Sequence, residues 1–395
     1  MAQRQIDPEQ TVLSCKYIES GVRFVIDGVR CCCANTYQSP LILSADEMKQ
    51  GKVTYDLVVQ RRRELFEALN GWNNKDIGDC AHCQLKYKTK YKNISFDYLG
   101  GHGLALSSGF NIQHFTQCNL RCSYCSFTQQ NDFRPPVYNN IIDFIELFRK
   151  KGKLKKGEWI EYNGGEPTLL PNFEELLNYL LKYKIGMVAV FSNAVKYSPA
   201  IYNALKANKI FLTTSIDAGT PATFKKVRGA DAYYQVLENC LRYQQSGTTK
   251  LFLKYILCDE NTTEDDLRGF VFAMCTIRPA RVYICPNFYY GDKQVTQKEV
   301  DFAARMWYLL EKYGSLSVYI QSDDMKGDPR FAEFSARTRK AYAQLIKQDG
   351  SRYCNLPKFY LMWRKFCFYI NFAKGANLFK LIRLKLGKMR KNNDQ

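Results

Sequence analysis

Between Gly109 and Tyr313 the chain alternates short apolar runs with longer amphipathic stretches, and this alternation limits its fold more than any other feature. The runs have the length of strands, and the stretches between them have the length and spacing of helices. Six successive strand–helix units predict a parallel sheet, and right-handed crossovers curl such units into a barrel-like arc. The expected strands are Phe110–Phe115, Trp159–Tyr162, Met187–Phe191, Ile210–Ser215, Lys250–Leu257 and Arg281–Ile284.

The expected helices follow these strands, and Asn172 is placed to cap one of them. They cover Asn140–Lys150, Phe173–Tyr183, Pro199–Ala207, Ala232–Gln245, Glu264–Cys275 and Gln297–Tyr313. Before the first strand, the chain mixes apolar runs at Tyr17–Ile26 and Val53–Val59 with a helix at Arg61–Leu69, and the glycine-rich stretch Leu99–Gly103 is typical of a linker. The sequence therefore predicts an α/β fold: a partial (β/α)6 TIM-like barrel at 108–321, a smaller N-terminal domain at 1–107, and a basic, partly helical C-terminal extension at 322–395.

The chain has 15 cysteines but lacks both an apolar run long enough to span a membrane and an apolar secretory signal at its start. We therefore expect a cytoplasmic protein, in which clustered cysteines indicate metal or redox chemistry rather than disulfides. The remaining cysteines lie singly, and single cysteines are typically small buried apolar side chains. These are Cys15, Cys240, Cys258, Cys275, Cys285, Cys354 and Cys367.

The first chemical motif reads Cys118-Asn-Leu-Arg-Cys122-Ser-Tyr-Cys125 and directly follows an expected strand. Three thiolates at this spacing on a tight loop can converge on one face of a cubane iron–sulfur cluster. Three ligands for four irons leave one iron open, as chemistry at the metal requires, whereas a structural site is normally closed. On this motif alone, a structural zinc knuckle or a set of buried thiols is the alternative.

The second motif, Asn163-Gly164-Gly165-Glu166-Pro167, lies at the end of the next strand. Two glycines let a ligand approach the backbone, and a neighbouring carboxylate can accept hydrogen bonds from an ammonium group. An ordinary strand–helix turn is the alternative. Because parallel barrels place their ligands at the carboxyl ends of the strands, we expect the two motifs to face the same cavity.

Together the two motifs resemble those of the radical S-adenosylmethionine (radical SAM) superfamily, and the resemblance covers roughly Gly109–Gln321. It implies that Cys118, Cys122 and Cys125 hold a 4Fe-4S cluster whose open iron binds S-adenosylmethionine. The implied activity is reductive cleavage of S-adenosylmethionine to a 5'-deoxyadenosyl radical, which takes a hydrogen atom from a substrate. An electron donor such as flavodoxin or ferredoxin is implied as a partner.

The same resemblance implies a set of cofactor-binding residues at successive strand ends. Tyr124 would lie by the adenine, the Gly-Gly-Glu motif would hold the amino group, and Asp217 would bind ribose or carboxylate. Several of these residues fit a turn or a helix cap equally well. The full set is Tyr124, Gly164, Gly165, Glu166, Ser192, Asn193, Ser215, Asp217 and Arg228, with Lys254 and Asn287 as further candidates.

A second metal site is expected from Cys80-Ala-His-Cys83 together with Cys31-Cys32-Cys33. On an extended segment Cys31 and Cys33 share a face, and an adjacent pair is the alternative. The expected site of Cys31, Cys33, Cys80 and Cys83 would hold a second Fe-S cluster or zinc; unligated thiols are the other reading. Radical SAM enzymes with auxiliary clusters usually carry them in a cysteine-rich C-terminal extension, which this chain lacks, so the peptide-modifying activity typical of that extension does not transfer directly.

The formal net charge of +19 is concentrated in the C-terminal tail, where residues 352–395 contain eleven Lys or Arg. The favoured interpretation of this tail is a solvated helix packed on the barrel. The second is peripheral contact with an anionic membrane, and binding to nucleic acid is the third. The expected substrate is a peptide or protein side chain, and next a carbohydrate or other small metabolite. The alternative from a different functional class is a non-catalytic iron–sulfur or zinc protein that binds nucleic acid through its basic surface. His102 and His114 are expected to be structural.

Overall fold

One ten-stranded sheet dominates the computed structural model, which describes residues 5–32, 39–83, 85–100, 109–155, 158–288, 293–321 and 328–349. From one edge to the other its strands are β12 (Val318–Ile320), β11 (Arg281–Pro286), β10 (Leu251–Leu257), β9 (Ile210–Ser215), β8 (Gly186–Phe191), β7 (Glu158–Tyr162), β6 (Phe110–Gln113), β2 (Val22–Val25), β3 (Gly28–Arg30) and β4 (Leu41–Ser44). The strands from β12 to β2 are parallel, and β3 and β4 continue the sheet antiparallel. A separate antiparallel ribbon pairs β1 (Thr11–Ser14) with β5 (Tyr87–Lys90).

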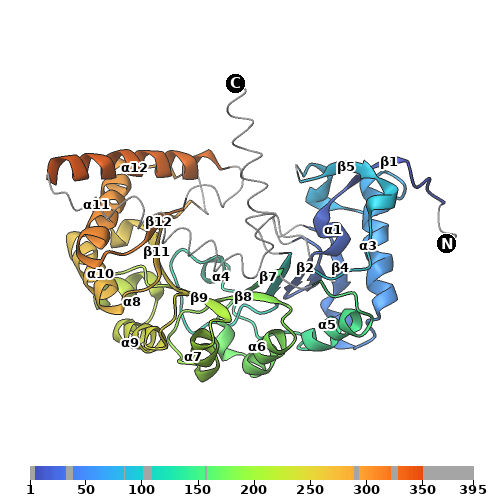
Figure 1. The fold of residues 1–395 in the computed structure, drawn as a ribbon, viewed down its shortest axis with the longest axis horizontal. Coiled ribbons are helices and arrows are strands. Elements are labelled where there is room, and N and C mark those ends of the chain that lie inside the picture. The colour runs from blue at the N-terminus through green and yellow to red at the C-terminus, as the bar shows by residue number, and fades with distance from the viewer. Residues whose placement is uncertain are drawn as a thin grey trace.

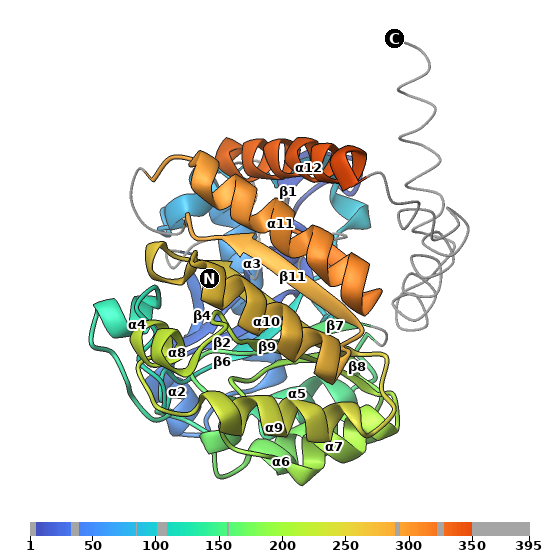
Figure 2. The ribbon, with the colours of Figure 1, turned by 90° about the vertical axis from the view of Figure 1, so that its left-hand side faces the viewer.

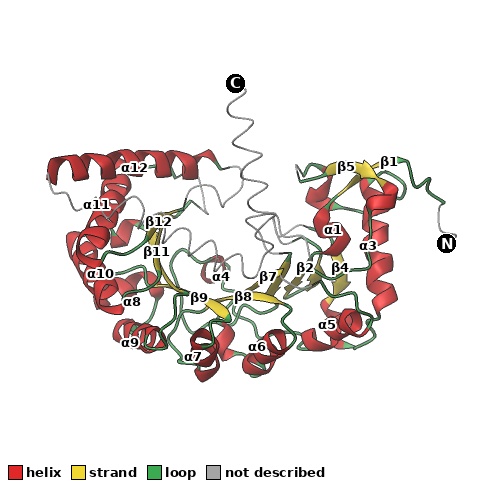
Figure 3. Ribbon diagram, viewed as in Figure 1, coloured by secondary structure: helices red, strands yellow, loops and turns green. Residues whose placement is uncertain are grey.

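The helices cover the convex side of the sheet, which curves as an open arc (Figure 1). Figure 3 shows α5, α6, α7, α9, α10 and α11 outside the arc of strands and the short helix α4 on its inner side, and Figure 2 shows α9, α10 and α11 in succession along one side. The helices are α1 (Lys16–Ser20), α2 (Ala45–Lys49), α3 (Tyr55–Leu69), α4 (Ser126–Gln129), α5 (Ile141–Lys150), α6 (Phe173–Lys182), α7 (Pro199–Lys206), α8 (Pro221–Arg228), α9 (Tyr233–Gln244), α10 (Glu264–Ile277), α11 (Gln297–Gly314) and α12 (Pro329–Asp349). Short 3₁₀ turns lie at η1 (Gly78–Ala81), η2 (Tyr91–Asn93), η3 (Pro167–Leu169) and η4 (Asp259–Asn261).

The main core lies between the sheet and these helices. Helix α6 illustrates how the sequence builds it: Phe173, Leu176, Leu177 and Leu180 are buried, and their spacing puts them on one helical stripe. On the strands, alternate residues face this core. Leu251, Leu253, Tyr255 and Leu257 of β10 belong to it, for example.

The predicted α/β fold with a parallel sheet is confirmed, and the six predicted strands correspond to β6–β11. Two further parallel strands, β2 and β12, and helix α8 were not predicted. Asn172 is the N-cap residue of α6, as predicted, but its side chain makes no capping hydrogen bond. Helix α3 begins at Tyr55 rather than Arg61, so most of the apolar run Val53–Val59 is helical.

Part of the N-terminal region joins the main sheet, because β2 pairs in parallel with β6, whereas β1 and β5 form a separate two-stranded sheet. The predicted linker begins inside the fold: Leu99 is buried and forms a bridge with Leu154, while Gly101–Gly103 lie outside the described residues. The division at 107/108 and 321/322 stays a prediction, and the tail from residue 350 onward also lies outside the described residues. No helix in the described part of the chain is long and apolar enough to cross a membrane.

His114 follows β6 and gives the fold a pH dependence. Its side chain is fully buried against the rings of Phe115 and Tyr138, whose centroids lie 5.4 and 5.5 Å away. Burial lowers the pKa of His114 to about 4, whereas an unfolded histidine has a pKa of about 6.5. Between these values the unfolded chain binds the proton more tightly, so stability falls as the pH falls.

We therefore expect the free energy of unfolding to drop by about 2 kcal/mol between pH 7 and pH 5 through this one group. His114→Gln removes the titration and should lessen the drop by that amount, whatever its effect at pH 7. Urea unfolding of both chains at the two pH values measures the difference. An equal loss in both chains would show that His114 is not the group that titrates.

Candidate active site at the cysteine loop

Cys118, Cys122 and Cys125 lie on the loop that leaves the carboxyl end of β6, and all three are half-buried. Distant parts of the chain hold this loop in place. The N–H of Arg121 donates to the carbonyl of Arg228 at 3.0 Å, at the end of α8.

The same end of α8 makes a second contact with the loop, because Ser123 N–H donates to the Val227 carbonyl at 2.9 Å. Gly229, which ends α8 with φ of +73°, completes the junction. A Cβ at this position would lie 2.6 Å from the Arg121 carbonyl oxygen. The loop therefore takes its shape from α8 rather than from its own sequence alone.

The sulfur of Cys118 faces two N–H donors. The backbone N–H of Leu120 lies 3.4 Å from Cys118 Sγ, and the amide Nδ2 of Asn193 lies 3.6 Å from it. Burial raises the pKa of Cys118 and raises that of Cys122 to about 11, while the charge of Arg228 acts in the opposite direction on both. A thiolate in such a place needs a positive partner, which bound iron provides; the residues present fit a thiolate-ligated cluster.

The Gly-Gly-Glu motif presses against the segment that leads into the cysteine loop. A Cβ at Gly164, where φ is +105°, would lie 2.8 Å from the Phe115 carbonyl oxygen, and one at Gly165 would lie 2.0 Å from that of Gln117. The N–H of Gly165 donates to Phe115 O at 3.1 Å, and the N–H of Glu166 donates to Gln117 O at 2.8 Å. The two motifs thus pack backbone against backbone, and only glycines allow that approach.

Glu166 is buried and held by several donors. Its Oε1 accepts from Thr168 Oγ1 and Ser192 Oγ, both at 2.7 Å, and also from Thr168 N–H at 3.2 Å. Its Oε2 accepts from the N–H of Asn193 at 2.6 Å. Burial raises the pKa of Glu166, and these hydrogen bonds partly offset the rise. Ser192 and Asn193 therefore support Glu166, and Thr168 is a supporting residue that the sequence reading missed.

Tyr124, Asp217 and Arg228 form a second buried group beside the loop. Arg228 Nη1 lies 2.7 Å from Asp217 Oδ2, and the Tyr124 hydroxyl contacts both side chains. Asp217 Oδ1 accepts from Ile256 N–H at 2.7 Å. Asp217 adopts φ of +56°, and its carbonyl accepts from the Asn261 side chain at 2.9 Å. The Asp217 carboxylate is thus committed to contacts within the protein.

The remaining predicted site residues lie on the later strands. Ser215 ends β9 and Lys254 lies within β10; both are half-buried. Asn287 follows β11, with its Nδ2 3.9 Å from Cys258 Sγ. Cys258 and Cys285 form a small buried cluster with Tyr124 packed against it, as expected of single cysteines used as apolar side chains.

The concave face of the sheet carries a row of aromatic rings apart from the main core. Trp159, Phe211, Phe252 and Tyr283 come from β7, β9, β10 and β11, and successive ring centroids lie 5.1, 5.2 and 5.8 Å apart. Both strand neighbours of Phe211, Phe252 and Tyr283, and Ile160 next to Trp159, belong to the core under the helices, so these rings face the opposite way. The inside of the arc therefore has an apolar wall.

The predicted second metal site is partly assembled. Cys31, Cys80 and Cys83 line one pocket, and Cys33 lies outside the described residues. Cys15, expected from the sequence to be a single buried cysteine, is half-buried, packs against the core and lines the same pocket. Within the described ranges, no group of three or more Cys, His, Asp or Glu side chains converges as ligands of a single metal ion, and this holds for the Cys118 loop as well.

Comparisons with known proteins agree with the motifs. Residues 112–271 match the family model described as the Radical SAM superfamily. The GTP 3',8-cyclase of Haemophilus ducreyi is 26% identical over 153 residues, covering 38% of this chain and 44% of the cyclase. Mycofactocin maturase MftC of Mycobacterium ulcerans is 28% identical over 146 residues, covering 35% of this chain and 37% of the maturase.

The chain thus spans less than half the length of the curated relatives it matches. Among solved structures, Streptococcus suis SuiB bound to its precursor peptide SuiA covers 74% of this chain and 56% of SuiB, at 15% identity and a TM-score of 0.43. The resemblance read from the two motifs is confirmed by the family match. Over residues 112–271 this chain carries the domain of the radical SAM superfamily of enzymes.

Proposed function

We propose that this chain cleaves S-adenosylmethionine reductively at a 4Fe-4S cluster held by Cys118, Cys122 and Cys125. When bound, these two cofactors supply a deoxyadenosyl radical that takes a hydrogen atom from a substrate. The observation that carries the proposal is the backbone packing of the Gly-Gly-Glu loop on the segment before Cys118, which puts three thiols and a buried carboxylate at one end of the sheet.

Glu166 is suited to hold the amino group of S-adenosylmethionine. Each carboxylate oxygen accepts about two hydrogen bonds. Oε1 already has three donors, whereas the structure gives Oε2 one donor in the described residues, the Asn193 N–H. Oε2 therefore keeps room for an ammonium donor, and the fixed Oε1 contacts hold the carboxylate in one orientation before the ligand arrives.

Tyr124, Asp217 and Arg228 are assigned a different role from the one the resemblance implied. Because Asp217 Oδ2 already accepts from both Arg228 Nη1 and the Tyr124 hydroxyl, we assign Asp217 to positioning these two side chains rather than to binding ribose. Arg228 then keeps a positive charge next to Cys122 and Cys118. Ser215, half-buried at the end of β9, remains the candidate for a ribose contact.

The substrate proposal is a peptide or protein side chain first and a small metabolite second. The matched relatives are named for both classes, a nucleotide cyclase and a maturase. A flavodoxin or ferredoxin is the proposed electron donor.

Anaerobic reconstitution with iron and sulfide, followed by dithionite and S-adenosylmethionine, tests the proposal. The expected result is release of deoxyadenosine, which is measured by chromatography. We expect Glu166→Gln to weaken S-adenosylmethionine binding by about 10- to 100-fold, the cost of losing a hydrogen bond to a charged group. Glu175→Gln, an exposed carboxylate on α6, is the matched control and should bind normally. Salt-dependent RNA binding without deoxyadenosine would favour the nucleic-acid alternative.

Gly165 gives a geometric prediction. An added methyl group would sit 2.0 Å from the Gln117 carbonyl, so one of the two loops must move. We expect Gly165→Ala to slow deoxyadenosine formation by about 100-fold, the usual cost of a displacement of about 1 Å at a reacting centre. Gly247→Ala is the control, because its φ is +74° but no atom lies within 4 Å of an added Cβ. Equal rates in the two variants would contradict the packing argument.

A further inference from the structure

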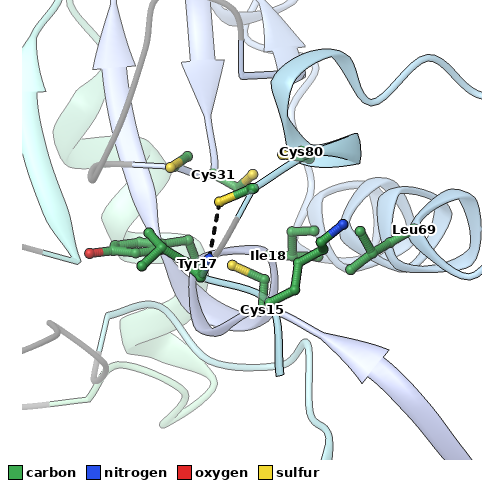
Figure 4. A pocket seen from close by; sticks show the side chains of 10 residues that line it. Cys15, Tyr17, Ile18, Cys31, Leu69 and Cys80 are labelled. Carbon is green, nitrogen blue, oxygen red and sulfur yellow. Dashed lines mark hydrogen bonds between the residues drawn. The ribbon is translucent and has the colours of Figure 1, made fainter. Parts of the chain in front are cut away.

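Five cysteines from three separate stretches of the N-terminal region line one pocket. Cys15 precedes α1, Cys31 and Cys32 follow β3, and Cys80 and Cys83 lie at and just after η1. Figure 4 shows the side chains of Cys15, Cys31 and Cys80 around this pocket. The other lining residues are mainly apolar: Tyr17, Ile18, Leu69 and Leu85, with Lys86. His82 is exposed and is not among them, although it lies between two of the cysteines.

We propose that this pocket holds a second iron–sulfur cluster, ligated by Cys15, Cys32, Cys80 and Cys83. Four thiolates close the coordination of a 4Fe-4S cluster, so this one has no open iron for S-adenosylmethionine. The proposal does not depend on the function proposed for the Cys118 loop. Compared with the ligand set expected from the sequence, it replaces Cys31 and Cys33 by Cys32 and by Cys15, which sequence spacing alone could not connect to the other cysteines.

The backbone around Cys83 repeats that of the Cys118 loop. In the loop, Leu120 N–H lies 3.4 Å from Cys118 Sγ, and two residues after Cys83 the N–H of Leu85 lies 3.4 Å from Cys83 Sγ. Both sites also contain a Cys-x-x-Cys turn. Cys125 N–H donates to the Cys122 carbonyl at 3.0 Å, and in the pocket the Cys83 N–H donates to the Cys80 carbonyl at 3.5 Å. Hydrogen bonds to the sulfurs are a regular feature of iron–sulfur ligation.

Cys32 is the ligand we choose from the adjacent pair. Both cysteines of the pair line the pocket, and Cys32 is 9% exposed whereas Cys31 is fully buried. The Cys31 backbone packs on Gly21, where an added Cβ would lie 2.3 Å from the Cys31 carbonyl oxygen. The thiols are spread around the pocket, whereas the four ligands of a zinc ion all meet one point at about 2.3 Å. A cluster of several metals suits that spread better.

The charges around the pocket suit an anionic group. A cluster with four thiolates is negative, and a buried negative charge needs compensation. Arg62 is fully buried, interacts electrostatically with Cys31, and donates to the carbonyls of Gly21 at 2.9 Å and Tyr98 at 2.6 Å. Lys86 supplies a second positive charge at the pocket wall.

The two cysteine sites lie at opposite ends of the sheet. Cys31 directly follows Arg30, which pairs with Arg23 near the start of β2, and Arg23 in turn pairs with Asn111 near the start of β6. The pocket therefore lies toward the amino ends of the parallel strands, whereas the Cys118 loop follows their carboxyl ends. A cluster in the pocket would be spectroscopically independent of S-adenosylmethionine.

Iron and acid-labile sulfide counts on the reconstituted full chain test the proposal without any substitution. We expect about eight of each per chain, since each 4Fe-4S cluster contributes four. A chain with Cys118, Cys122 and Cys125 replaced by alanine should keep about four of each. After dithionite reduction, its paramagnetic resonance signal should not change when S-adenosylmethionine is added. About four irons in the full chain and none in this variant, or zinc in place of iron, would overturn the proposal.

A second set of variants checks the ligands. Added to the alanine background, Cys15→Ser or the pair Cys80→Ser and Cys83→Ser should abolish the remaining iron, and Cys31→Ser should leave it. Cys275→Ser, a half-buried cysteine on α10, is the matched control. Full iron in the Cys80/Cys83 variant would also overturn the proposal. Failure of deoxyadenosine formation with the second signal intact would count against the proposed function alone.

Discussion

A chain with Cys118, Cys122 and Cys125 all replaced by alanine is expected to form no deoxyadenosine above the no-protein background. The physical reason is that no other described cysteine lies on the loop beside Gly165 and Glu166, so nothing else can hold a cluster next to the site for the amino group. This is the largest effect we predict. The measurement is anaerobic product formation from reconstituted protein with dithionite and S-adenosylmethionine.

The control for this variant is Cys240→Ala, a fully buried cysteine on α9. It removes a thiol and some packing but no ligand, so its deoxyadenosine rate should stay close to that of the wild-type chain. Circular dichroism melting of both variants separates loss of ligands from loss of fold. An undiminished rate in the triple variant would refute the proposed function.

Arg228→Met is expected to lower the free energy of unfolding by about 3–5 kcal/mol, because it leaves a buried carboxylate without its cation. Asp217 is fully buried, Arg228 is almost so, and their charged atoms lie 2.7 Å apart. Denaturant unfolding measures the change. The variant should also lose cluster occupancy, since the guanidinium interacts with Cys122 and Cys118.

Two further variants test the electrostatic origin of this effect. Arg228→Met combined with Asp217→Asn removes both charges, so it should be less destabilised than the sum of the single changes. Arg268→Met breaks an exposed ion pair with Glu264, whose atoms lie 3.0 Å apart; it should cost no more than about 1 kcal/mol. If the losses in free energy of unfolding of the two single variants simply add in the double variant, the ion pair between Asp217 and Arg228 does not stabilise the fold.

The sequence predicted the strand–helix alternation well because each unit repeats a local pattern. Helix α8 was missed although its signals are local: Thr220 caps it, Pro221 starts it and Gly229 ends it. Strand β2 was missed for another reason. Its apolar run is continuous with α1, and only pairing with β6, far along the chain, decides where the strand begins.

The candidate site shows the same division between local and distant information. The cysteine spacing and the Gly-Gly-Glu motif can be read from neighbouring residues, and the structure brings them together. That Tyr124, Asp217 and Arg228 contact one another, and that Cys15 joins Cys80 and Cys83, depends on tertiary packing. The carboxylate of Asp217 suggested that this residue binds a ligand. In the structure its hydrogen-bond donors are instead Arg228 and the Ile256 N–H, which come from other elements of the fold.

The contacts of the cysteine loop have a consequence for biosynthesis. The loop takes its backbone partners from Gly165 and from Val227–Gly229, so a nascent chain that ends just after Cys125 lacks the later segments that shape the loop. Roughly a hundred more residues must be translated first, which takes about 5–20 s at ordinary ribosome speeds. We therefore expect assembly of the proposed cluster at this loop to follow the docking of α8, and a chain truncated before Gly229 to hold the three cysteines without their α8 partners.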